Sequence, residues 1–240
     1  MITIAALGIL SNKARGIEAV YIVSGNLHPT TTLRPYFAGR IPINSVFTYQ
    51  IPVSPFFSDH KEEQQKISAH FQEHLGDTDN VLLLGWSIGG KFAGPLVNKF
   101  SNIKKVILMD PMDGAPPLSK PSLKFPFLTK IPIKRHKASL EVLIIKAEFN
   151  TRHPYPWFKC HIAEQGAQLF LHQFAAFEPQ FQIVPEAGHN DLLFPPISRL
   201  GRLACSPGTS PPARSIQITR RAIHNMLRKW GLLDCVTKPY

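Results

Sequence analysis

The sequence is short of cysteine and of acidic residues for its 240 positions. Its three cysteines, Cys160, Cys205 and Cys235, cannot all pair within one chain, and no CxxC motif occurs. This pattern disfavours a disulfide scaffold and a structural zinc site, and we expect no metal ion and no cofactor. Sixteen Asp and Glu stand against 27 Lys and Arg, so the formal charge is +11. A positive charge permits attraction to an anionic partner without identifying one.

Long apolar runs are also missing. The longest, residues 2–10 and 81–85, are far shorter than the roughly 20 residues that a transmembrane helix needs. Residues 2–10 lack the basic start of a signal peptide and are followed at once by polar residues, so we expect a cytoplasmic protein. The hydrophobic content of 44% excludes intrinsic disorder, and the length fits one domain over residues 1–240.

Short apolar strands alternate with helical stretches along the chain. We predict strands at residues 19–23, 45–53, 81–84, 105–109, 141–146 and 181–184, and helices at 59–75, 88–100, 158–174 and 216–230. Asp59 and Glu62 have the spacing of a capping box at the start of the first helix. Continuous apolar strands separated by helices are typical of a mostly parallel sheet with helices on both faces, which places the chain in the α/β class.

Two stretches interrupt this alternation. Residues 114–140 are rich in Pro and Lys and contain no acid, and residues 194–215 are rich in Pro, Gly and Ser. Long loops in α/β enzymes are often lids, so we predict a lid or insertion at 114–140. Within it, residues 125–134 mix apolar side chains with lysines. This mixture is compatible with contact to an apolar substrate, with docking on an anionic membrane surface, or with a solvated loop.

The strongest chemical signal is Gly-Trp-Ser-Ile-Gly at residues 85–89, directly after the most apolar strand and before a helix. This is the context of a nucleophile elbow, in which small residues on both sides of the serine prevent a clash with the neighbouring strand and helix. We predict that Ser87 is a nucleophile. The alternative is an ordinary turn between a strand and a helix.

A serine nucleophile needs a base and an acid, and the chain offers both in the order Ser, acid, His. His189 follows the last predicted strand and is the predicted base. Asp110, Glu148 and Asp113 are candidates for the acid that orients its imidazole. Asp110 is preferred because it ends a strand whose loop can reach His189, although an Asp before Pro also commonly starts a turn.

Other groups are predicted to complete the site. The backbone N–H groups of Ile88 and Asn26 are the predicted donors of an oxyanion hole, although Asn26 also fits a plain turn after its strand. The predicted substrate contacts are Trp86, Leu27, Phe125 and Phe127. His70 and His74 lie one helical turn apart, where a solvated helix face is favoured over a metal site.

Three motifs resemble those of the chlorophyllase-like branch of the α/β-hydrolases. They are Gly-Trp-Ser-Ile-Gly-Gly-Lys at 85–91, Met-Asp-Pro-Met-Asp-Gly at 109–114 and Gly-His-Asn-Asp-Leu-Leu at 188–193. The resemblance implies an α/β-hydrolase fold and a triad of Ser87, Asp110 and His189, which supports Asp110 as the acid. Trp86 and Ile88 stand where that branch has His and Arg, so hydrolysis of esters in general is expected rather than of chlorophyll.

The predicted function is therefore that of a serine carboxylic-ester hydrolase, an esterase or lipase-like enzyme acting on a small-molecule apolar ester. The alternative is a catalytically altered protein of the same fold that binds an apolar or acidic ligand or a membrane surface. A nucleic-acid partner is not expected, because no RNA-binding signature or interleaved basic and aromatic motif accompanies the positive charge.

Overall fold

Six parallel strands form the centre of the protein, seen here in a computed structural model that describes residues 16–25, 32–38, 41, 45–52, 59–113, 128–134, 140–149, 166–193 and 208–231. Their order across the sheet is β2-β1-β3-β4-β5-β6. The strands are β1 (Ala19–Ser24), β2 (Val46–Gln50), β3 (Val81–Trp86), β4 (Ile103–Met109), β5 (Glu141–Ala147) and β6 (Gln180–Val184). All six correspond to predicted strands, so the predicted parallel sheet is confirmed.

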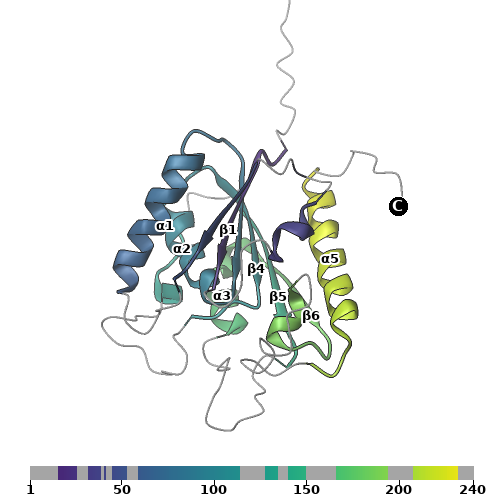
Figure 1. The fold of residues 1–240 in the computed structure, drawn as a ribbon. Helices are drawn as coiled ribbons and strands as arrows, with labels where there is room; N and C mark the ends of the chain where they lie inside the picture. The colour runs from purple at the N-terminus through teal and green to yellow at the C-terminus, as the bar shows by residue number, and fades with distance from the viewer. Residues whose placement is uncertain are drawn as a thin grey trace, which may run out of the picture.

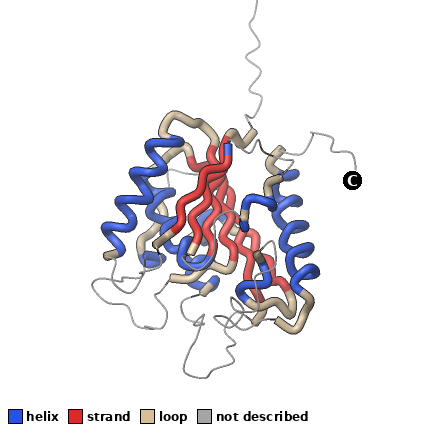
Figure 2. Tube along the Cα trace, viewed as in Figure 1, coloured by secondary structure: helices blue, strands red, loops and turns tan. Residues whose placement is uncertain are grey.

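Helices cover both faces of this sheet (Figures 1 and 2). One face carries α1 (His60–Leu75), α2 (Ala93–Lys99) and α3 (Ala167–Gln173), and the other carries α5 (Pro212–Lys229) and the short helix η2 (Arg34–Tyr36). Successive side chains of a strand point to opposite faces, so each strand feeds two cores. In β3, for example, Leu83 packs on the α1 side and Leu84 on the α5 side.

Helix α1 shows how the local sequence sets an element. The Asp59 side chain accepts a hydrogen bond from the N–H of Lys61 at 2.8 Å and so caps the first turn, as predicted. Glu62, the other half of the predicted capping box, instead pairs with Lys66 at 2.7 Å. The apolar stripe of the helix is buried against the sheet, and Ile67 and Phe71 have no exposed surface.

The predicted helix 88–100 is divided in two. Residues Ser87–Phe92 form the 3-10 helix η4, and the α-helix α2 begins only at Ala93. Pro95 explains the late start, because proline has no N–H and is tolerated only in the first turn of an α-helix. Helix α3 begins at Ala167, and the earlier part of the predicted helix 158–174 lies outside the described residues.

Most of the predicted lid, residues 114–127 and 135–139, also lies outside the described residues. The part that the structure describes includes the short helix η5 (Leu128–Lys130). Leu128 and Ile133 are buried in the core on the α1 side, whereas Ile131 is 40% exposed. Two of the apolar residues in the lysine-containing run therefore belong to the core of the molecule. No helix in the described part of the chain combines the length and hydrophobicity needed to cross a bilayer.

Phe71 belongs to the core between the sheet and helix α1, and its replacement tests the packing of that core. Phe71→Ala should lower the free energy of unfolding by about 3–5 kcal/mol, because it leaves a cavity between α1, β1 and Phe100. Chemical denaturation measures this change. Gln65→Ala, at an exposed position of the same helix, is the matched control and should change the stability little. Equal effects of the two substitutions would contradict the packing described here.

Candidate active site

Ser87 lies at the sharp turn where β3 passes into η4. Its φ of 55° is in the left-handed region, which residues other than glycine seldom adopt. Such a backbone costs of order 1–3 kcal/mol and persists only where the surrounding structure enforces it. The Gly-Trp-Ser-Ile-Gly motif thus forms the strained turn that it predicts, at the carboxyl edge of the sheet.

Two glycines after the serine allow η4 to approach its neighbours closely. A Cβ atom on Gly89 would collide with the backbone carbonyl of Val23 in β1. A Cβ atom on Gly90 would lie 2.6 Å from the Cβ of Pro111, in the turn that follows β4. Real Cβ atoms essentially never come so close to other atoms. The elbow therefore fits between β1 and this turn because both positions lack a side chain.

Ser87, His189 and Asp110 form one hydrogen-bonded chain. Nε2 of His189 lies 3.0 Å from Oγ of Ser87, and Nδ1 lies 2.5 Å from Oδ2 of Asp110. The three residues come from η4, from η8 (His189–Leu192) and from the end of β4, and their exposed fractions are 8%, 3% and 0%. A serine, an imidazole and a carboxylate in this order can activate the serine oxygen as a nucleophile.

The backbone of β5 holds Asp110 in place. The N–H of Asp110 donates to the carbonyl of Ile145 at 2.6 Å, and Oδ1 of its side chain accepts from the N–H of Ala147 at 3.0 Å. Its φ of 42° also lies in the left-handed region. One carboxylate oxygen is thus occupied by the sheet, which leaves the other to face His189.

The turn that carries His189 is restrained by Asp191. Oδ2 of Asp191 accepts hydrogen bonds from the N–H groups of Gly188 at 2.9 Å and Gly208 at 2.5 Å. Sequence reasoning missed this residue, although an acid at the third position of a helical turn has capping-box spacing and could have indicated the role. Asp191 therefore restrains the backbone of the turn from which the imidazole projects.

Trp86 packs against the imidazole of His189. The two rings are stacked, with centroids 5.0 Å apart and an interplanar angle of 18°. The tryptophan is 2% exposed and belongs to the core on the α5 side. The indole of Trp86 is thus packed on the imidazole, and contact of Trp86 with a substrate stays a prediction.

The loop after β1 begins beside the nucleophile. The N–H of Gly25 donates to the carbonyl of Trp86 at 3.2 Å, and a Cβ atom on Gly25 would lie 3.5 Å from Oγ of Ser87. Ile88, whose N–H is a predicted oxyanion donor, follows Ser87 in η4. The remaining predicted residues lie outside the described part of the chain and stay predictions: Asn26, Leu27, Phe125 and Phe127.

Of the three candidate acids, the structure brings Asp110 to His189. Glu148 is exposed, and its Oε2 accepts from the N–H of Glu186 at 2.7 Å. Asp113 is fully buried, and its Oδ2 accepts from the N–H and the hydroxyl of Thr129 at 2.7 and 2.5 Å. The carboxylates of Glu148 and Asp113 are therefore hydrogen-bonded to groups other than His189.

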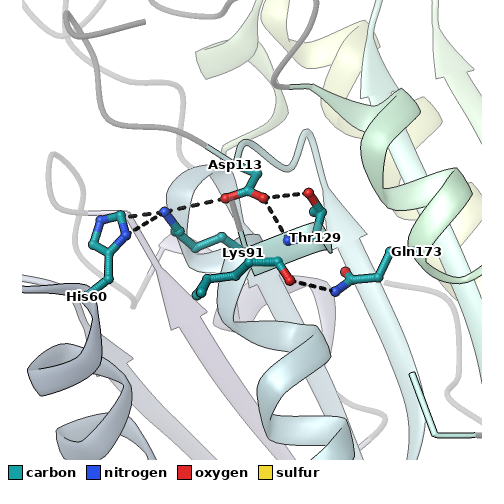
Figure 3. Close-up of polar contacts among 6 residues, drawn as sticks. His60, Lys91, Asp113, Thr129 and Gln173 are labelled. Atoms are coloured by element: carbon teal, nitrogen blue, oxygen red, sulfur yellow. Dashed lines mark hydrogen bonds and ion pairs between the residues drawn. The ribbon is translucent and has the colours of Figure 1, made fainter. Parts of the chain in front are cut away.

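Sequence reasoning also missed a buried polar group beside the elbow, which we call the lysine cluster: Lys91, Asp113, His60 and Thr129 (Figure 3). Nζ of Lys91 lies 2.8 Å from Nδ1 of His60 and 3.4 Å from Oδ1 of Asp113. Burial lowers the pKa of Lys91 to about 8, and the neighbouring Asp113 opposes this effect. The sequence signal was a single lysine among small and apolar residues at 88–97, a setting in which a charge becomes buried.

His70 and His74 are part of an aromatic surface on α1. Nδ1 of His70 lies 3.1 Å from the hydroxyl of Tyr21, and the ring of His74 stacks on Phe47 with centroids 5.4 Å apart. Burial lowers the pKa of His70, and His74 lowers it further. Among the described residues, no group of three or more His, Cys, Asp or Glu side chains is placed to hold a metal ion.

Comparison with known proteins identifies the fold. No family model and no curated protein matches the sequence. Solved structures do match: the ydeN gene product of B. subtilis has a TM-score of 0.53 at 14% identity, over 89% of this chain and 98% of that one. A protein of unknown function from Agrobacterium tumefaciens, assigned to the α/β hydrolases, has a TM-score of 0.53 at 12% identity, over 94% and 91%.

A third match is a ferulic acid esterase from Streptomyces cinnamoneus, with a TM-score of 0.52 at 14% identity over 92% of this chain and 72% of that one. Identities this low concern the fold alone. The resemblance to the chlorophyllase-like branch therefore stays a prediction that rests on three motifs. Together with the six-stranded parallel sheet, the matches confirm that the chain has the α/β-hydrolase fold.

Proposed function

We propose that this protein is a serine carboxylic-ester hydrolase that works through an acyl-enzyme. The observation that carries the proposal is the hydrogen-bonded chain from Ser87 through His189 to Asp110, at 3.0 and 2.5 Å, on a strained turn at the carboxyl edge of the sheet. In open α/β sheets, this edge is where ligands bind.

In the first half of the reaction, Oγ of Ser87 attacks the ester carbonyl carbon while Nε2 of His189 takes the hydroxyl proton. The tetrahedral intermediate collapses when His189 returns this proton to the leaving alcohol, and the acyl group stays on Ser87. In the second half, His189 takes a proton from water, and the resulting hydroxide attacks the acyl carbon. The carboxylic acid then leaves and the proton returns to Ser87.

Asp110 stabilises the imidazolium that forms twice in this cycle, and it holds the tautomer in which Nδ1 carries hydrogen. The bond from Ala147 to its other oxygen keeps the carboxylate aimed at the ring. The developing oxyanion would be bound by the N–H of Ile88 and by that of Asn26, the predicted second donor. Gly25, which precedes Asn26, lies close to the nucleophile, since a Cβ atom there would lie 3.5 Å from Oγ of Ser87.

We propose a small apolar ester as the substrate. Two observations support this class: the apolar side chains in the sequence of the predicted lid at 114–140, and the presence of a ferulic acid esterase among the proteins of similar fold. We further propose that the same enzyme docks on an anionic membrane surface. This docking is supported by the +11 charge and by two adjacent exposed residues, Lys130 at the end of η5 and Ile131 directly after it.

The central prediction concerns the nucleophile. Ser87→Ala should lower the turnover of p-nitrophenyl esters by about 10³- to 10⁶-fold, because only binding and the oxyanion hole remain. It should also abolish covalent labelling by a fluorophosphonate, read by intact-protein mass spectrometry. Ser101→Ala, in an exposed turn, is the control and should retain both. A folded wild-type protein that neither labels nor turns over esters of any acyl length would be a binding protein on this fold.

A second prediction separates the candidate acids. Asp110→Asn should lower kcat by about 10³- to 10⁴-fold, because an amide cannot stabilise the imidazolium and favours the wrong tautomer. Glu148→Gln should leave kcat close to the wild-type value, since its carboxylate contacts the backbone of Glu186. Steady-state kinetics at neutral pH measure both. The opposite ranking of the two variants would reassign the acid to Glu148.

A further inference from the structure

The lysine cluster lies against the elbow but takes no part in the mechanism above. Lys91 and Asp113 have no exposed surface, and His60 and Thr129 are 4% and 8% exposed. Figure 3 shows the ammonium group of Lys91 between the imidazole of His60 and the carboxylate of Asp113. Four different segments of the chain supply these side chains: the start of α1, η4, the turn after β4 and η5.

Stability alone does not account for this ion pair. Removing a lysine and a carboxylate from water is costly, and apolar residues of similar volume often serve as well or better. A buried pair of this kind can instead fix how the segments that carry it lie against one another. Each member of the pair lies close in sequence to a residue of the triad. Lys91 is four residues after Ser87, and Asp113 is three residues after Asp110.

The two segments that carry the pair, η4 and the turn 110–113, are in contact at two further points. The N–H of Met112 donates to the carbonyl of Ser87 at 3.0 Å, and Gly90 lies directly against Pro111. The turn at residues 110–113 begins at a strained Asp110, with a φ of 42°, so it needs restraints from outside to keep its shape. The pair supplies one such restraint at the far end of the turn.

The environment of Asp113 makes this restraint rigid. Thr129 donates two hydrogen bonds to Oδ2, while the other oxygen faces Lys91. The helix η5 that carries Thr129 is in turn held by α3, since Nε2 of Gln173 donates to the carbonyls of Leu128 and Ile131 at 3.1 Å each. The carboxylate of Asp113 thus connects the turn to η5 through Thr129 and to η4 through Lys91.

We infer that Lys91 and Asp113 are positioning residues. Their ion pair holds the turn 110–113 on η4, so that Asp110 stays within hydrogen-bond distance of His189 while Ser87 stays within reach of the same imidazole. This inference rests on the proposed function, because the geometry that it protects is that of the triad. It assigns no contact with substrate to either residue.

Because Lys91 can lose its proton, the strength of the ion pair should depend on pH. Among the described residues, the titratable groups in contact with its ammonium are His60 from α1 and Asp113 from the turn. Because burial lowers the pKa of Lys91 to about 8, the ammonium loses its proton as the pH rises through that value. The pair then loses its attraction, and activity should fall on the alkaline side of pH 8.

The test compares Lys91→Met, Asp113→Asn and the double variant with wild type. Methionine keeps the length of the lysine stem, and asparagine keeps an oxygen for Thr129, so the double variant removes the charges and leaves neither one buried alone. We expect kcat for p-nitrophenyl acetate to fall about 10- to 100-fold in Lys91→Met and in the double variant, with KM almost unchanged, since a small displacement of a catalytic group has effects of this size.

The profile of kcat between pH 6 and 9.5, corrected for spontaneous hydrolysis, provides the readout that a merely structural pair would not move. Wild type should show an alkaline decline near pH 8, and the double variant should not. Lys99→Met, at an exposed lysine of α2, is the control and should keep the wild-type profile. A folded double variant with wild-type kcat and the same decline would overturn the inference.

A measurement without turnover keeps the two proposals separate. The proton on Nδ1 of His189, in its short bond to Asp110, should give a low-field proton resonance that Asp110→Asn removes. We expect the double variant to weaken or lose this resonance, and an unchanged resonance would count against the positioning role. If wild-type protein shows the resonance but no hydrolysis that depends on Ser87, the proposed function is wrong. The comparison of the resonance in wild type and in the double variant still tests whether the pair positions Asp110.

Discussion

The close approach of η4 to β1 and to the turn after β4 is the constraint on which the rest of the site depends. It places Ser87 at the carboxyl edge of the sheet and forces its backbone into the left-handed region. The same approach brings Pro111 onto Gly90, and hence the start of the turn, Asp110, toward the imidazole. A side chain at Gly89 or Gly90 would separate these segments and disperse the three reacting groups.

Much of the fold could be predicted because its strands are continuous apolar runs bounded by polar turns. Each of the six predicted strands lies in the sheet, and α1 begins at the predicted cap. The division between η4 and α2 could not be read from apolar periodicity, which continues through both. Pro95 carried that information, because its missing N–H restricts it to the first turn of an α-helix.

The candidate site divides in a similar way. Ser87 stands in a motif whose small neighbouring residues have a mechanical reason, and His189 follows the last strand in the order Ser, acid, His, so the sequence could indicate both. The preference for Asp110 over Glu148 and Asp113 could also be predicted, from the strand end that it occupies and from the resemblance of its motif. The structure places the carboxylate of Asp110 at His189 and that of Asp113 at Lys91. The small and apolar neighbours of Lys91 indicate that this lysine is buried. Its pairing with distant His60 and Asp113 leaves no local pattern, and this is why the lysine cluster could not be predicted.

The all-parallel sheet has a consequence for how the protein assembles. Parallel neighbours cannot form as local hairpins, since each pair needs a crossover connection. Ser87 and His189 are 102 residues apart in the chain, and His189 and Asp110 are 79 apart. Contacts of this separation carry a large loop-closure entropy and form slowly. Reactivity of the serine would accordingly serve as a marker of the fully assembled chain, distinguishing it from compact intermediates that already contain helices.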